Sequence, residues 1–243
     1  VPAGRLAAID QMNESRFRTV PPEATDQLEA SSGPGLEYHP LPMGDRRFLL
    51  TIAGIYTALI ILLTLTISPY FAQGWDVTTF IAAAGSLLDG QHSPLALYQQ
   101  SRADFYWPYA YPPLHALLVA PFLLLHRLLP ILPESLLASL PVLRFDLGRA
   151  WFLYTEVGKR TPIDADKCRL GLLAAILWLF NPVTLYHTAV QAHFESEWVL
   201  LVLLAYALAT QTFQVSKTWK VWVAASLLLA AAILVKQIAV IYA

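Results

Sequence analysis

The chain has 243 residues, of which 56% are hydrophobic and 14% charged, and its mean hydropathy is +0.51. Because a soluble domain carries charge on about a quarter of its residues, this composition favours an integral membrane protein. The net charge of −1 gives no positive excess for binding nucleic acid, and the single cysteine, Cys168, excludes an intramolecular disulfide and a cysteine-based metal site.

The N-terminal residues 1–47 are polar and proline-rich, which predicts a disordered tail. The tail ends in Arg46-Arg47, directly before an uncharged apolar run over 48–68 that is long enough to span a bilayer. The positive-inside rule therefore places the tail in the cytoplasm and directs the first span outward. The run is too long, and begins too far into the chain, to be a signal peptide.

A long polar and aromatic loop follows over 69–112, with a short helix predicted inside it and a single basic residue, Arg102. Aromatic residues at this density are typical of a membrane–water interface, although ordinary loop packing would also use them. The next segment, 113–132, is apolar enough to span but contains prolines, His126 and Arg127. Whether 113–132 crosses the membrane decides on which side each later loop lies.

If 113–132 crosses the membrane, the loop 158–169 with its four basic residues lies outside. If 113–132 is interfacial or re-entrant, the basic gaps 158–169 and 214–220 both lie inside, which satisfies the positive-inside rule at every loop. We therefore predict a cytoplasmic N-terminus and a transmembrane domain over 48–243, with spans at about 48–68, 139–157, 170–189, 198–213 and 219–238. The sequence stops at Ala243 without a polar tail, which predicts that a C-terminal part is missing.

Several short motifs occur in an order that resembles the GT-C superfamily of polyprenyl-phosphate-sugar-dependent glycosyltransferases. The motifs are Gly74-Trp75-Asp76, Leu88-Asp89-Gly90, Ser93-Pro94-Leu95-Ala96-Leu97-Tyr98, Tyr111-Pro112-Pro113-Leu114, Asn181-Pro182, Gln191-Ala192-His193-Phe194-Glu195 and Leu234-Val235-Lys236-Gln237. The resemblance covers about Phe48 to Gln237. It implies an all-α polytopic membrane fold, a GT-C-like transmembrane helix bundle with membrane-parallel helices in the first outer loop.

The resemblance assigns the role of general base to Asp76, the acid in the first outer loop. Tyr111, His193 and Glu195 lie in its motifs and are the candidates for substrate binding. At Glu195 the chain departs from the family, which often has Gln-Phe-Asp or His-Phe-Gln at this motif. A plainer interpretation makes Asp76 a helix cap and His193 a polar lining residue. His193 and Glu197 are four residues apart, but without a third ligand they indicate no metal site.

Charged residues inside the predicted spans need partners or a polar cavity, because an unpaired charge is costly in a bilayer. Asp146 and Arg149 are three residues apart and are predicted to pair on one helix face. Arg144 and Lys236 are the candidates for binding a lipid phosphate, while Lys236 can also extend toward the interface from the end of its helix.

The predicted function is inverting transfer of a hexose from a polyprenyl-phosphate donor to a lipid or glycan acceptor on the extracytoplasmic side of a membrane such as the bacterial plasma membrane. The chain has no glycine-rich phosphate loop, and no metal or other cofactor is predicted. Two alternatives remain. The first is a polytopic transporter, which would use Asp146, Arg149 and Lys236 near the midplane. The second is a truncated, non-catalytic membrane subunit.

Overall fold

The computed structural model describes residues 43–71, 74–89, 110–161, 164–214 and 219–237. These residues form helices and contain no strand, which confirms the all-α class predicted from the sequence. Most of the predicted tail, 1–42, lies outside the described residues. The first described helix begins at Met43 and includes Arg46 and Arg47, so it starts within the last residues of the segment assigned to the tail.

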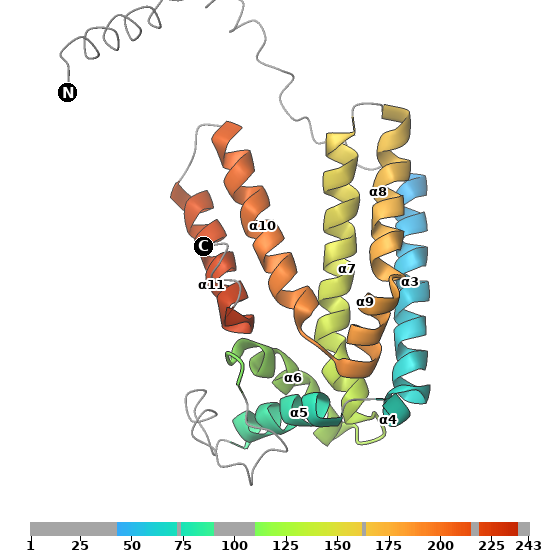
Figure 1. The fold of residues 1–243 in the computed structure, drawn as a ribbon, viewed down its shortest axis with the longest axis vertical. Coiled ribbons are helices and arrows are strands. Elements are labelled where there is room, and N and C mark those ends of the chain that lie inside the picture. The colour runs from blue at the N-terminus through green and yellow to red at the C-terminus, as the bar shows by residue number, and fades with distance from the viewer. Residues whose placement is uncertain (1–42, 72–73, 90–109, 162–163, 215–218, 238–243) are drawn as a thin grey trace, which may run out of the picture. The chain divides into compact units, whose positions relative to one another are not determined.

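Within the described residues, five long elements run lengthwise and alternate in direction (Figure 1). They are α3 (Met43–Thr66), α7 (Glu134–Arg160), α8 (Asp164–Leu179) with its continuation, α10 (Glu195–Gln214) and α11 (Trp219–Val235). The short α4 (Ser68–Phe71) follows α3.

Two shorter helices, α5 (Gly74–Leu88) and α6 (Leu114–Leu128), pack on each other and lie across one end of the long helices (Figure 1). We call this the α5–α6 end. Arg127 Nη2 donates a 2.6 Å hydrogen bond to Asp89 Oδ1, which ties the last turn of α6 to the end of α5. We call the opposite end, where α3 begins and α7 gives way to α8, the basic end. It carries Arg46, Arg47, Lys159 and Arg160.

The helix predicted as a single span over 170–189 is broken in the structure. It ends at Leu179, resumes as α9 (Pro182–Tyr186) at an angle of 45°, and continues as the π-helix η2 (His187–Gln191). The break has a local cause. Proline has no backbone N–H to continue the helix, and the Asn181 side chain instead caps the new one by accepting a 2.8 Å hydrogen bond from the Val183 N–H. Ala192 then ends η2 in the left-handed conformation, with φ 47°.

Neighbouring long helices approach closely at two glycines. A Cβ added to Gly171 of α8 would collide with the backbone carbonyl of Tyr154 in α7. A Cβ added to Gly148 of α7 would lie 2.8 Å from Leu200 Cδ2 of α10. Small residues that let helix backbones meet in this way are typical of helix pairs in membranes.

Length and composition identify fewer membrane spans than predicted. Among the described helices, Arg46–Tyr70 is long and apolar enough to cross a membrane, and the bent pair Lys167–Leu179 with Pro182–Gln191 qualifies if it is counted as one span. Trp219–Val235 and Leu114–Leu128 are apolar but shorter. One or two spans therefore meet the test in the described part of the chain, and the five-span bundle stays a prediction.

Candidate functional site

An aromatic cluster at the α5–α6 end joins residues from distant parts of the chain. Its centre is Phe194, which is fully buried in the turn before α10. The Tyr111 ring lies 4.7 Å from it, the His115 ring 5.1 Å and the stacked His193 ring 4.6 Å, measured between centroids. Phe80 of α5 lies 5.4 Å away. The motifs before α6 and before α10, far apart in sequence, therefore meet at one ring.

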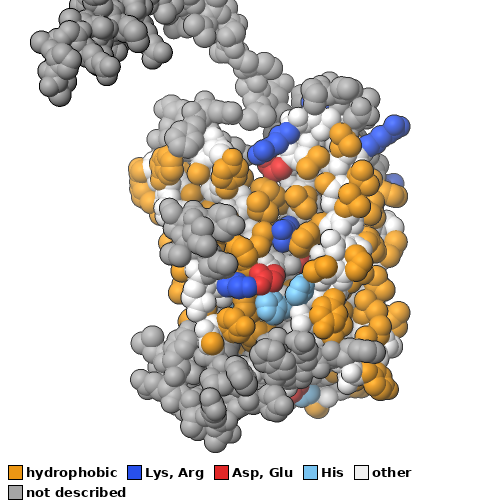
Figure 2. Space-filling view, in the orientation of Figure 1, with side chains coloured by type: hydrophobic (Ala, Val, Ile, Leu, Met, Phe, Trp, Pro, Cys, Tyr) orange, Lys and Arg blue, Asp and Glu red, His pale blue; other side chains and the backbone are white. Residues whose placement is uncertain are grey.

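A polar cluster covers these rings. Glu195, the first residue of α10, accepts hydrogen bonds from Lys236 Nζ, just past the end of α11, and from Trp198 Nε1. His193 Nδ1 lies 3.6 Å from Glu195 Oε1, and the Lys236 ammonium lies 5.6 Å from the centre of the Phe194 ring. The three charged or titratable side chains are 14–32% exposed. Figure 2 shows basic, acidic and histidine side chains side by side on a face that is otherwise mainly hydrophobic.

The charges of the cluster follow from its surroundings. Burial lowers the pKa of His193 to about 4, and the nearby positive charge of Lys236 acts in the same direction, while Glu195 opposes both. The Glu195 carboxylate accepts hydrogen bonds from Lys236 and Trp198, and such bonds favour its charged form. At neutral pH the cluster is therefore an ion pair beside a neutral imidazole. The His193 and Glu195 side chains can form hydrogen bonds with hydroxyl groups of a ligand, and the Lys236 ammonium can bind an anionic group.

The lowered pKa of His193 predicts a dependence of stability on pH. The ordinary histidine pKa is 6.5, so between pH 6.5 and 4 the unfolded chain binds a proton that the folded chain does not. Stability should fall as the pH drops through this window. His193→Asn stays neutral, so melting curves recorded from pH 7 to 5 should show a smaller loss than in the unchanged protein. Identical losses would mean that His193 is protonated normally.

A second histidine and carboxylate lie beneath the cluster, and the sequence analysis missed their pairing. His115 Nδ1 lies 3.0 Å from both carboxylate oxygens of Glu197, and both side chains are fully buried. The spacing of His193 and Glu197 had suggested a shared face, but Glu197 turns to α6 instead. The available signal was chemical: a histidine and a glutamate in apolar helices each need a partner when buried.

Asp146 is also fully buried, but its partners differ from the prediction. Tyr56 of α3 donates a 2.7 Å hydrogen bond to its carboxylate, Thr188 of η2 donates another at 2.5 Å, and Ser196 of α10 donates a third. The predicted pair with Arg149 is wrong, since these two described side chains form no ion pair. The Arg149 guanidinium lies 3.6 Å from the centre of the Trp178 ring of α8 instead. Hydroxyls from three other elements reach the carboxylate first because α7 lies among them.

The hydrogen bond from Thr188 to Asp146 should contribute measurably to the stability of the protein. Removing one hydrogen-bond partner of a buried polar group costs about 1–3 kcal/mol, so Thr188→Val should lower the free energy of unfolding in detergent by about this amount. Thr57→Val is the matched control, because the Thr57 hydroxyl donates only to the Ala53 carbonyl of its own helix, at 2.8 Å. Equal effects of the two substitutions would show that the Asp146 bond contributes nothing beyond a local one.

The remaining predicted residues are not all brought to the cluster. Arg144 is exposed on α7 with its guanidinium 5.9 Å from the Phe145 ring, and no described contact joins it to Glu195 or Lys236. Asp76 lies in the first turn of α5, one turn before Phe80, and its side chain is outside the described residues. In the described part, no group of three or more His, Cys, Asp or Glu side chains is arranged to hold a metal ion.

Comparison with family models, with curated proteins and with solved structures finds no match for the chain, so its fold and side-chain chemistry carry the functional argument.

Proposed function

We propose that the chain is a polytopic membrane protein in which the five lengthwise elements span the bilayer and α5 and α6 lie in its interface. Support comes from large apolar side chains that point away from the core along these elements, among them Leu62 (56% exposed), Leu177 (63%) and Leu227 (65%). So much exposed apolar surface is unfavourable in water but suits lipid. The carboxyl group of Asp146 is meanwhile hydrogen-bonded by hydroxyls of three other elements, as a buried polar group in a membrane requires.

The basic end is cytoplasmic in this proposal, which predicts a labelling pattern. In a Cys168→Ser background, Thr161→Cys at the basic end should react with an impermeant maleimide only after the membrane is opened. Ala110→Cys, which is exposed at the α5–α6 end, should react in intact cells. The positive-inside rule gives the direction. Labelling of Thr161→Cys from outside would make α6 a true crossing and overturn the proposed spans.

In this membrane frame the function we propose is GT-C-type glycosyl transfer on the extracytoplasmic side, from a polyprenyl-phosphate-linked hexose. The observation that carries it is the convergence of Tyr111, His193, Glu195 and Lys236 at the α5–α6 end, beside the helix whose first turn contains Asp76. These residues come from the motifs that resemble the family. A donor anchored in the membrane presents its head group at the interface, where this cluster would lie.

The proposed reaction is a single displacement. Asp76 accepts the proton of the acceptor hydroxyl as its oxygen forms a bond to the anomeric carbon. The bond from that carbon to the phosphate oxygen breaks, the configuration inverts, and the polyprenyl phosphate leaves with the electron pair. The neutral imidazole of His193 donates or accepts hydrogen bonds with sugar hydroxyls, and the Glu195 carboxylate accepts them. Lys236 lies against the negative charge of the phosphate.

The direct test is transfer of radiolabelled hexose from a polyprenyl-phosphate carrier by membranes that contain the protein. Label should appear in an acceptor lipid or glycan, and Glu195→Gln should reduce it while Glu134→Gln, an exposed acid at the start of α7, should not. Uptake of labelled solute into vesicles without transfer would favour the transporter. The absence of both transfer and uptake would favour the non-catalytic subunit.

A further inference from the structure

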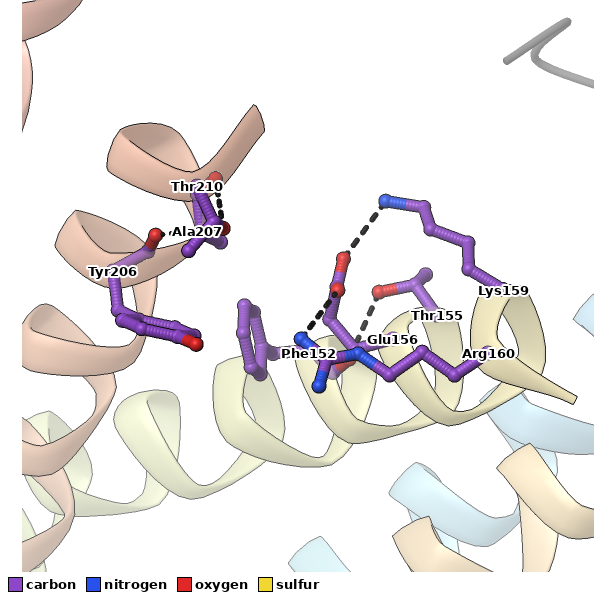
Figure 3. A network of polar contacts seen from close by, with 8 residues as sticks. All are labelled: Phe152, Thr155, Glu156, Lys159, Arg160, Tyr206, Ala207 and Thr210. Carbon is purple, nitrogen blue, oxygen red and sulfur yellow. Dashed lines mark hydrogen bonds and ion pairs between the residues drawn. The ribbon is translucent and has the colours of Figure 1, made fainter. Parts of the chain in front are cut away.

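A cavity of about 330 Å³ lies between α7 and α10, away from the cluster around Glu195. The two helices meet at Gly148 and Leu200 and separate toward the basic end, as Figure 1 shows. Most of the lining is apolar. The large or apolar side chains in this part are those of Trp151, Phe152, Leu200, Leu204, Ala207 and Leu208. Phe152 and Tyr206 face each other across the gap (Figure 3). An apolar groove of this kind has room for a hydrocarbon chain.

The polar part of the lining consists of Thr155, Glu156 and Lys159 from the last turns of α7. Lys159 Nζ lies 2.8 Å from one oxygen of Glu156, and Arg160 Nη2 lies 3.9 Å from the other (Figure 3). Two cations therefore share one carboxylate, and one positive charge is left over. Arg160 is 69% exposed and Lys159 42%, so both can reach a ligand outside the groove.

We propose that this groove binds an anionic phospholipid from the leaflet at the basic end. An acyl chain occupies the apolar part between α7 and α10, and the phosphate lies against Lys159 and Arg160. Basic pockets between transmembrane helices on the cytoplasmic side bind anionic head groups for the same reason. The inference rests on the proposed membrane placement but not on the proposed reaction. The leftover charge favours an anionic head group over a zwitterionic one.

Trp151 supplies a reporter inside the groove. The protein is reconstituted in vesicles that contain phosphatidylglycerol or phosphatidylcholine with brominated acyl chains, which quench tryptophan fluorescence on contact. The signal of Trp151 is the difference between the unchanged protein and Trp151→Phe. We expect brominated phosphatidylglycerol to quench it at about fivefold lower mole fraction than phosphatidylcholine, the preference that one basic side chain near an anionic lipid supplies.

Two variants test the two parts of the site, each with a matched control. Ala207→Phe fills the groove and should abolish the difference between the lipids, whereas Ala230→Phe on the exposed side of α11 should preserve it. Lys159→Gln should remove the fivefold preference, whereas Lys220→Gln, an exposed lysine at the same end, should keep it. Mass spectrometry of lipid that remains on the unchanged protein gives a second readout that needs no variant.

The outcomes separate this inference from the proposals above. Equal quenching by both lipids, or Ala207→Phe behaving like Ala230→Phe, overturns the phospholipid site. If other tryptophans are quenched but Trp151 is not, the phospholipid site is also overturned, because something other than lipid then fills the groove. If neither lipid quenches any tryptophan, the membrane placement fails and the site fails with it. Loss of sugar transfer with lipid binding intact would overturn only the glycosyltransferase.

Discussion

Replacing Asp76 with asparagine should lower the rate of sugar transfer by about 10²–10⁴-fold, the usual contribution of a general base, and leave expression unchanged. Asparagine keeps the size of the side chain and cannot accept the proton of the acceptor hydroxyl. The position supports the assignment, since Asp76 lies in the first turn of α5 and α5 contributes Phe80 to the ring cluster. The measurement is initial-rate transfer of labelled hexose at saturating donor.

The same substitution also tests the plainer role of Asp76. Asparagine caps a helix about as well as aspartate, so a capping residue would tolerate the change and transfer would continue at nearly the normal rate. Asp89→Asn is the matched control, because it changes an acid at the other end of α5 whose described partner is Arg127. A normal rate in Asp76→Asn would reject the base, and equal losses in both variants would point to folding of the α5–α6 end.

Removing one partner of the His115–Glu197 pair should cost about 3–5 kcal/mol of stability, because the other is then buried without a partner. Glu197→Leu should lower the melting temperature in detergent by on the order of 10 °C, given how melting temperature scales with chain length. The double variant His115→Leu with Glu197→Leu should recover most of this loss, since two apolar side chains replace a buried pair at little cost.

A matched control isolates the effect of burial. Glu134 and His126 form a similar pair at 3.6 Å, but their side chains are 50% and 27% exposed. Glu134→Leu should therefore change stability by less than about 1 kcal/mol. If Glu197→Leu behaves like Glu134→Leu, the buried pair does not hold α6 against α10. If the double variant is as unstable as Glu197→Leu, the two side chains act separately.

The cluster around Glu195 was largely predictable from the sequence. Tyr111, His193, Glu195 and Lys236 were chosen from short motifs, and the structure brings all four to the ring of Phe194. Arg144 was chosen only because it is a charge inside an apolar helix, and it lies apart. The order of the motifs therefore predicted which segments lie together in the structure. The presence of a single charged residue in an apolar helix did not predict where that residue lies.

The partners of buried charges could not be predicted in the same way. Asp146 was assigned to Arg149 because three residues separate them, yet its hydroxyl partners lie 42 to 90 residues away in sequence. His115 and Glu197 are 82 residues apart. Helical spacing describes neighbours on one helix, and a buried carboxylate bonds to whichever donors the neighbouring helices place beside it.

The sequence by itself determined the all-α class, the approximate positions of the longer helices and the segments that meet at the α5–α6 end. These depend on apolar runs, on proline and on charge, which are features of continuous stretches of sequence. Only the tertiary structure decided the 45° break after Leu179, the buried His115–Glu197 pair and the groove between α7 and α10. Each of them depends on the angle and distance at which two helices pack. Side chains from both helices set that geometry together, so neither stretch of sequence contains it alone.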